Sequence, residues 1–167
     1  AQGTEGRGAS AFLVRIIEAG VSGNRNYYPA DVLRVSAPRF EGARVFVKGD
    51  KEHLAGQGKD FRNLIGCISN VRFLEADGGS LVGVLKLLEP SGPVAVKLRE
   101  AWDRGMTGLF GLSMDADGDA VNDRINGQAV RRDVAIRKVD SVALIVEPGA
   151  GGAIINFIEA TKDDDMK

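Results

Sequence analysis

Residues 64–88 read LIGCISNVRFLEADGGSLVGVLKLL and contain two apolar runs separated by a polar turn. The runs, 64–74 and 81–88, are rich in Ile, Val, Leu and Phe, which pack well on a half-buried sheet and favour strands. The turn EADGGS contains Asp77-Gly78, a dipeptide typical of tight hairpins because both residues tolerate a positive φ. This stretch therefore predicts an antiparallel pair of strands.

Similar apolar runs on both sides of this hairpin predict further strands. They are 11–19, 44–47, 109–115, 129–136, 138–146 and 153–158, with a break expected at Arg137. Residues 117–127 are polar and predict a hairpin or an excursion from the sheet. Residues 48–63, KGDKEHLAGQGKDFRN, carry three glycines and predict a long exposed loop.

Two segments predict helices. Residues 93–104, PVAVKLREAWDR, repeat apolar side chains at helical spacing, with Pro93 suited to the first helical position and Gly105 to the position past the end. Residues 29–35 also begin with proline. The chain is therefore expected to form an α+β, mainly β fold, as a single domain over 1–167 with a flexible lead (1–10) and a charged tail (159–167).

The composition excludes several classes of function. Lys+Arg number 22 and Asp+Glu 23, so the net charge of −1 argues against a protein held on nucleic acid by bulk charge, and it gives no basis for binding an acidic membrane. No apolar run approaches the ~20 residues that span a bilayer. The single cysteine and single histidine exclude an internal disulfide framework, a CxxC site and most histidine-built metal centres.

Three side chains remain as candidates for chemistry, and each also has an ordinary structural interpretation. Ser113 in GLFGLSMDAD follows two glycines that leave room for an incoming carbonyl group, although strand serines are common. His53 in KGDKEHLAGQGK is polar-flanked, like most surface histidines. Cys67, among apolar neighbours, is expected to be a small buried hydrophobe, and a Cys67–His53 nucleophile pair is the less favoured alternative.

The acidic stretch after Ser113 resembles part of a calcium loop. Asp115, Asp117 and Asp119 occupy the first three ligand positions, but Ala120 and Asn126 stand where an EF-hand needs Gly and Glu. An acidic turn is therefore the better interpretation. We expect no metal and no cofactor.

The order of these features resembles the prohead (capsid maturation) serine proteases of tailed bacteriophages, which are related to the herpesvirus assemblins. The matching stretches lie within 44–154: VFVKGDKEHL, FRNLIGCISNVRF, LREAWDRGMTGLFGLSMDADG and VRRDVAIRKVDSVALIVEPGAGGAI. They include a G-x-x-G-x-S strand and a strand that runs into a turn of proline followed by small residues.

The resemblance implies a serine endopeptidase built on a small closed antiparallel β-barrel with a few surrounding helices. Its substrates would be phage scaffold protein, segments of the major capsid protein, and itself, inside the immature capsid in the bacterial host cytoplasm. A homo-oligomer is expected, without nucleic acid or membrane as partner. His53 corresponds to the general base and Ser113 to the nucleophile, and oxyanion donors are expected near the turn 149–152.

The third catalytic residue implied by the resemblance is an acid on the strand before that turn. Asp140 is the only acid there before Glu147, and strand alternation places it with Val142 and Leu144 on one face. An ion pair with Arg131, Arg132 or Arg137 is the alternative role for Asp140. Asp50, Glu52 and Asp133 are the next acids to consider.

Two other functions remain open. A non-catalytic scaffold or assembly module of the same fold would not need an intact Ser113 and His53. A small-ligand-binding β-barrel would need an apolar interior pocket, and an aromatic content of 6% gives that little support.

Overall fold

The structure is a computed structural model that describes residues 11–158, so the predicted lead and tail lie outside the described residues. Within this range one sheet has the order β2-β3-β8-β4-β5-β6-β1-β9, with β7 paired to β8. The strands are β1 Ala11–Glu18, β2 Gly20–Val21, β3 Asn26–Tyr28, β4 Arg44–Val47, β5 Leu64–Leu74, β6 Ser80–Leu87, β7 Gly111–Ile125, β8 Gln128–Ile145 and β9 Ala153–Ile158. The α-helices are α2 Ala30–Ser36, α3 Asp50–Leu54 and α4 Pro93–Asp103, and short 3-10 turns cover Ala37–Phe40, Phe61–Asn63, Ala76–Gly78 and Thr107–Leu109.

The predicted hairpin is confirmed. β5 and β6 pair antiparallel, with Ile68 opposite Leu85 and Leu74 opposite Ser80. Asp77 and Gly78 both have a positive φ, of 53° and 88°, in the turn that joins them. The predicted strands over 11–19, 44–47 and 153–158 also match β1, β4 and β9.

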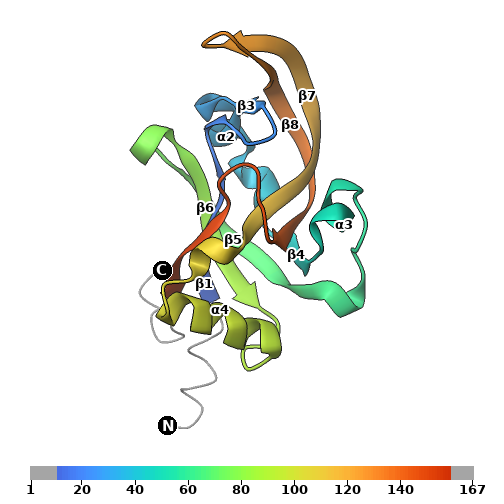
Figure 1. The fold of residues 1–167 in the computed structure, drawn as a ribbon, viewed down its shortest axis with the longest axis vertical. Helices are drawn as coiled ribbons and strands as arrows, with labels where there is room; N and C mark the ends of the chain where they lie inside the picture. Colours follow the sequence, from blue (N-terminus) through green and yellow to red (C-terminus); the bar gives the residue numbers. More distant parts are fainter. Residues whose placement is uncertain (1–10, 159–167) are drawn as a thin grey trace.

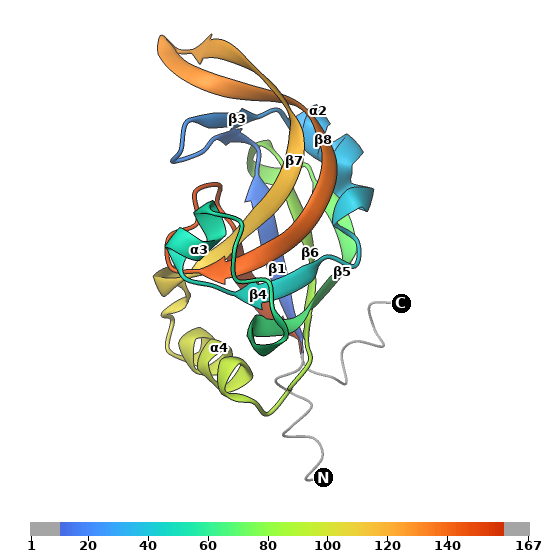
Figure 2. The ribbon, with the colours of Figure 1, turned by 90° about the vertical axis from the view of Figure 1, so that its right-hand side faces the viewer.

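The sheet curls into a half-barrel, so the closed antiparallel barrel expected above is wrong (Figure 1, Figure 2). Two of the strand pairs, β3–β8 and β4–β8, are parallel. The gap between β7 and the start of β9 is bridged by a hydrogen bond from Leu112 N–H to Gly152 O, 3.3 Å long. Beyond this point β7 leaves with β8 as a projecting hairpin, which leaves the barrel open (Figure 2).

Bulges in β8 bend this hairpin. β8 has 18 residues and β7 has 15, and three register shifts leave Val134, Arg137 and Asp140 without a partner on β7. The predicted break at Arg137 is therefore one of three bulges in a continuous strand. Each bulge adds local twist and turns its side chain away from the regular alternation.

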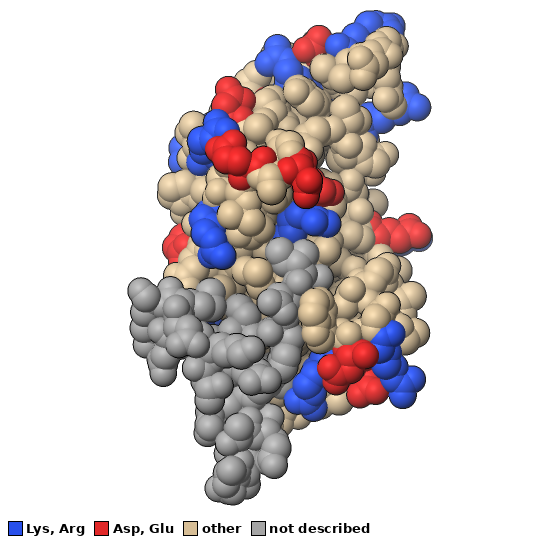
Figure 3. Space-filling view, turned by 90° about the vertical axis from the view of Figure 1, so that its left-hand side faces the viewer, with Lys and Arg blue, Asp and Glu red and all other residues tan. Residues whose placement is uncertain are grey.

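The core lies inside the curled sheet, with α2 packed against it. Its fully buried side chains include Phe12, Val14, Ile16, Leu33, Phe40, Val45, Ile68, Leu85, Leu112 and Val142. In residues 11–158 the helices are too short or too polar to cross a bilayer. On the face seen in Figure 3, Lys and Arg are interspersed with Asp and Glu rather than gathered into a field of one sign.

The prediction of a long exposed loop over residues 48–63 is wrong in part, because this segment contains helix α3. The Glu52 carboxylate accepts a 3.0 Å hydrogen bond from the N–H of Gly49, where the helix begins. Asp50 and Glu52 lie in its first turn, where negative charge stabilises the helix dipole. His53 is therefore held on a helix rather than on an open loop.

Candidate active site

The structure brings His53 and Ser113 together. The Nε2 atom of His53 lies 2.9 Å from the Oγ atom of Ser113, although the two residues are 60 positions apart in the sequence. Ser113 lies near the start of β7, opposite Ala143 of β8, and His53 lies on α3. This is the contact that a base needs to remove the hydroxyl proton from a nucleophilic serine.

Helix α3 is tied to the end of β8 at its first residue. The Asp50 carboxylate accepts hydrogen bonds of 3.1 Å from the backbone N–H groups of Val146 and Glu147. Because Val146 directly follows β8, this contact fixes the helix beside the strand that pairs with β7.

Two glycines allow the turn 149–152 to lie next to β7, the strand that carries Ser113. A Cβ atom at Gly152 would collide with the carbonyl oxygen of Leu112, and one at Gly111 would collide with the carbonyl oxygen of Gly152. Gly149 and Ala150 consequently line the same cavity as Ser113 and His53.

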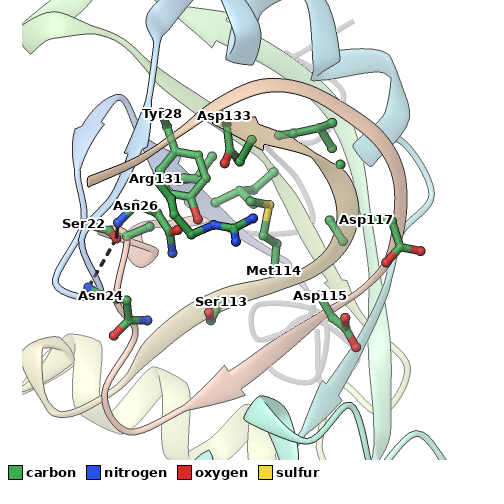
Figure 4. A pocket seen from close by; sticks show the side chains of 18 of the residues that line it. Ser22, Asn24, Asn26, Tyr28, Ser113, Met114, Asp115, Asp117, Arg131 and Asp133 are labelled. Carbon is green, nitrogen blue, oxygen red and sulfur yellow. Dashed lines mark hydrogen bonds between the residues drawn. The ribbon is translucent and has the colours of Figure 1, made fainter. Parts of the chain in front are cut away.

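The cavity has a volume of about 340 Å³ and a largely polar lining. Ser113 and Asp115 lie along β7 on one side, and Tyr28, Arg131 and Asp133 lie across from them (Figure 4). Burial raises the pKa of Tyr28 to about 12, and the nearby Asp133 adds to the effect, so the phenol stays neutral. Burial also raises the pKa of Asp133.

The surroundings of His53 favour its neutral form. Burial lowers the pKa of the imidazole below its ordinary 6.5, and the nearby Lys48 ammonium lowers it further. The carboxylates of Asp115 and Asp50 raise the pKa of His53, whereas the Lys59 ammonium lowers it, as Lys48 does. A neutral imidazole at neutral pH can accept a proton from Ser113.

Lys48 is an unusual neighbour of this pair. Its residue is only 5% exposed, and its Nζ atom makes no hydrogen bond to any residue of the described chain. Burial is the main cause that lowers the pKa of Lys48, with Lys59 second. A buried ammonium so close to His53 disfavours protonation of the imidazole.

The structure does not bring Asp140 to His53. The Asp140 carboxylate forms a 3.2 Å ion pair with Lys138, and its side chain is 27% exposed. The Nδ1 atom of His53 is buried and makes no hydrogen bond to any described residue. Asp140 is a bulge residue without a partner on β7, and its carboxylate pairs with Lys138, two residues earlier on the same strand, rather than with any of the arginines considered above.

The other acids considered also have different roles. Glu52 accepts the N–H of Gly49 at the start of α3, and Asp50 accepts the N–H groups of Val146 and Glu147 after β8. Asp133 lies in the wall of the cavity, among the residues opposite Ser113. None of the described carboxylates accepts a hydrogen bond from His53 Nδ1.

Asp140→Asn distinguishes this geometry from the role implied by the resemblance. We expect turnover to stay within about threefold of wild type, because an ion pair whose lysine is 71% exposed has little effect on His53. The loss of a working triad acid would instead cost about 10⁴-fold. Steady-state kinetics of the purified variant, with Lys138→Met as the matched control, decide between the two.

Cys67 is exposed, so the expectation of a buried cysteine is wrong. Strand alternation turns Ile68 into the core and Cys67 outward, opposite Arg44 and Lys86 of the flanking strands. Cys67 is also not among the residues that line the cavity of Ser113 and His53. His53, the proposed partner in the cysteine alternative, contacts Ser113 instead.

Cys67→Ser is expected to change neither activity nor stability measurably, with any change in unfolding free energy within about 0.5 kcal/mol. The reason is that an exposed strand side chain leaves no cavity when it is replaced. Chemical denaturation and a peptidase assay measure the two effects. Protection of activity by substrate against a thiol reagent would contradict this prediction and favour the cysteine alternative.

One feature of the site was not predicted, the ion pair between Lys59 and Asp115. The Lys59 Nζ atom lies 2.6 Å from the Oδ2 atom of Asp115. The signal was present in the sequence, because Asp115 is two residues after Ser113 on the same strand and period-two alternation places them on one face. Asp119 pairs with Arg137 at 3.4 Å, and no group of three or more potential metal ligands occurs in the part of the chain that is described.

Comparison with known proteins identifies no relative of this chain. No protein-family model matches the sequence, and neither a curated protein nor a solved structure matches it.

Proposed function

We propose that this protein is a serine endopeptidase in which Ser113 is the nucleophile and His53 the general base. The observation that carries the proposal is the 2.9 Å contact between His53 Nε2 and Ser113 Oγ in a polar cavity. The half-buried imidazole with its lowered pKa supports it, because a base must be neutral to act.

The reaction follows from these two side chains. As the Ser113 oxygen attacks the scissile carbonyl carbon, its proton passes to His53 Nε2 and a tetrahedral oxyanion forms. His53 then returns the proton to the leaving amine, and the acyl chain remains on Ser113 as an ester. A water molecule, deprotonated by the same imidazole, releases the acid and regenerates the serine. We place the oxyanion next to the turn 149–152, since its Gly149 and Ala150 line this cavity.

We further propose a role in phage capsid maturation, on the strength of the ordered sequence motifs over 44–154. In that role the substrates are scaffold protein, segments of the major capsid protein and the protein itself, inside the immature capsid in the host cytoplasm. The barrel of that family would correspond here to the half-barrel of β1 and β4 to β9.

The proposal is tested by incubating the purified chain with an unfolded protein and with a library of quenched fluorescent peptides. Time-dependent cleavage is expected from wild type and from Ser91→Ala, a control at an exposed serine outside the cavity. Cleavage by neither protein would favour a non-catalytic assembly module, and undiminished cleavage by Ser113→Ala would show that Ser113 is not the nucleophile.

The pH dependence has a definite sign. The pKa of His53 is lowered from 6.5, so kcat/KM is expected to rise with pH along an acid limb whose midpoint lies below 6.5 and to be fully developed at pH 7. The midpoint is measured from kcat/KM between pH 4.5 and 8. An acid limb centred above pH 7 would contradict the assignment of this half-buried imidazole as the base.

A further inference from the structure

The ion pair between Lys59 and Asp115 joins the two segments that carry the proposed catalytic pair. Lys59 lies five residues after the end of α3, and Asp115 lies two residues after Ser113 on β7. Their atoms are 2.6 Å apart, and both side chains are largely shielded, at 30% and 23% exposure. Such a partly buried pair is held more firmly than an ion pair in open solvent.

The segment between α3 and Lys59 is short and folds back over the same strand. The N–H of Gly56 donates to the carbonyl oxygen of His53, and a Cβ atom at Gly56 would lie 3.9 Å from Asp115 Oδ2. Gly58, which has a φ of 81°, turns the chain toward Lys48 and Glu52. The ion pair therefore fastens the segment after α3 to β7, as Asp50 fastens the start of α3 to the end of β8.

His53 depends on such anchors because no carboxylate of the described residues orients its ring. Its Nδ1 atom is buried without a hydrogen bond to any described residue, so the Asp50 contacts before His53 and the Lys59–Asp115 ion pair after it hold Nε2 over the Ser113 hydroxyl. A small displacement of that contact costs rate steeply, because proton transfer needs a heavy-atom distance of about 2.6–3.2 Å.

We infer that Lys59 and Asp115 are positioning residues, whose ion pair holds His53 against Ser113 and whose opposite charges act on the imidazole from the β7 side. This inference rests on the proposed function for its catalytic consequence. The position and environment of His53, however, can be measured without any activity.

The two charges give the inference a signature that a purely structural contact would lack. The groups that act on His53 are Lys48 after β4, Asp50 on α3, Asp115 on β7 and Lys59 after α3. Asp115 raises the pKa of His53, and Lys59 lowers it by less. Removing one or the other therefore moves the imidazole titration in opposite directions.

The experiment is an NMR titration of the single histidine of the chain. Relative to wild type, we expect the midpoint to fall in Asp115→Asn and to rise by a smaller amount in Lys59→Met. In the double variant it should lie slightly below wild type. Asp123→Asn and Arg132→Met, which break a 2.8 Å ion pair elsewhere on the β7–β8 hairpin, should leave it unchanged.

The positioning role is measured by kinetics on the same proteins. We expect Asp115→Asn and Lys59→Met each to lower kcat by about tenfold with KM little changed, and Lys59→Arg, which keeps the ion pair, to stay near wild type. Thermal melts identify variants that are simply unfolded.

Midpoints that shift in the same direction, or that do not move, would overturn the inference even if the protein is an active peptidase. Opposite shifts in a protein without peptidase activity would support the placement of the charges and reject the proposed function instead.

Discussion

Ser113→Ala is expected to reduce peptidase turnover by at least 10³-fold while leaving the fold intact. The substitution removes only the hydroxyl at 2.9 Å from His53 Nε2 and therefore the atom that forms the acyl-enzyme. It leaves the β7–β8 pairing of this position with Ala143 unchanged. Cleavage of a fluorescent peptide measures the loss, and thermal denaturation checks the fold.

The matched control is Ser91→Ala, which removes a hydroxyl outside the cavity and should retain wild-type rates. If Ser113→Ala kept more than about one hundredth of the wild-type turnover, Ser113 would not be the nucleophile, because losing that atom from a serine protease costs far more.

His53→Ala is expected to cause a loss of similar size. Without the imidazole, no other described side chain hydrogen-bonds to Ser113 Oγ, so the hydroxyl keeps its proton and stays a weak nucleophile. The two losses should not add, since the serine and the base act in one step. Turnover of the double variant, compared with each single variant, measures this.

Lys51→Ala is the control on the same helix, because Lys51 is exposed on α3 and should tolerate the change. Additive losses in the double variant would show that His53 and Ser113 act independently, and a fully active His53→Ala would remove the histidine from the mechanism.

The strands could be predicted because their evidence is local. The run 64–88 carries its own turn signal, and 93–104 carries both helix ends and a buried face, of which Ala95, Leu98 and Ala101 form the most buried part. A second turn signal was present but not used. Asn126 and Gly127, with φ values of 51° and 80°, form the two-residue turn that makes 111–145 one long hairpin.

Helix α3 could not be predicted from apolar periodicity, because none of its five residues is buried. Its stability comes from contacts made by polar groups, such as Glu52 with the Gly49 N–H and Asp50 with the N–H groups of Val146 and Glu147. The second of these links residues that are about a hundred positions apart, which no local pattern reports.

The closed barrel and the catalytic role of Asp140 were both implied by the resemblance rather than by a local pattern in the residues. Alternation along a strand holds only while the register is unbroken, and bulges at Val134, Arg137 and Asp140 shift it three times. Asp140, at one of these bulges, forms an ion pair with Lys138, and the β7–β8 hairpin projects out of the barrel wall. Cys67, in contrast, was mispredicted from its apolar neighbours although alternation with the buried Ile68 places it outward.

The pairing of Ser113 with His53 is tested most directly by a fluorophosphonate probe, with the modified residue identified by peptide mass mapping. We predict one adduct per chain, on Ser113, formed at a rate that rises with pH through a midpoint below 6.5 and lost in His53→Ala. No adduct in the folded wild-type protein, an adduct on another residue, or an unchanged rate in His53→Ala would contradict it.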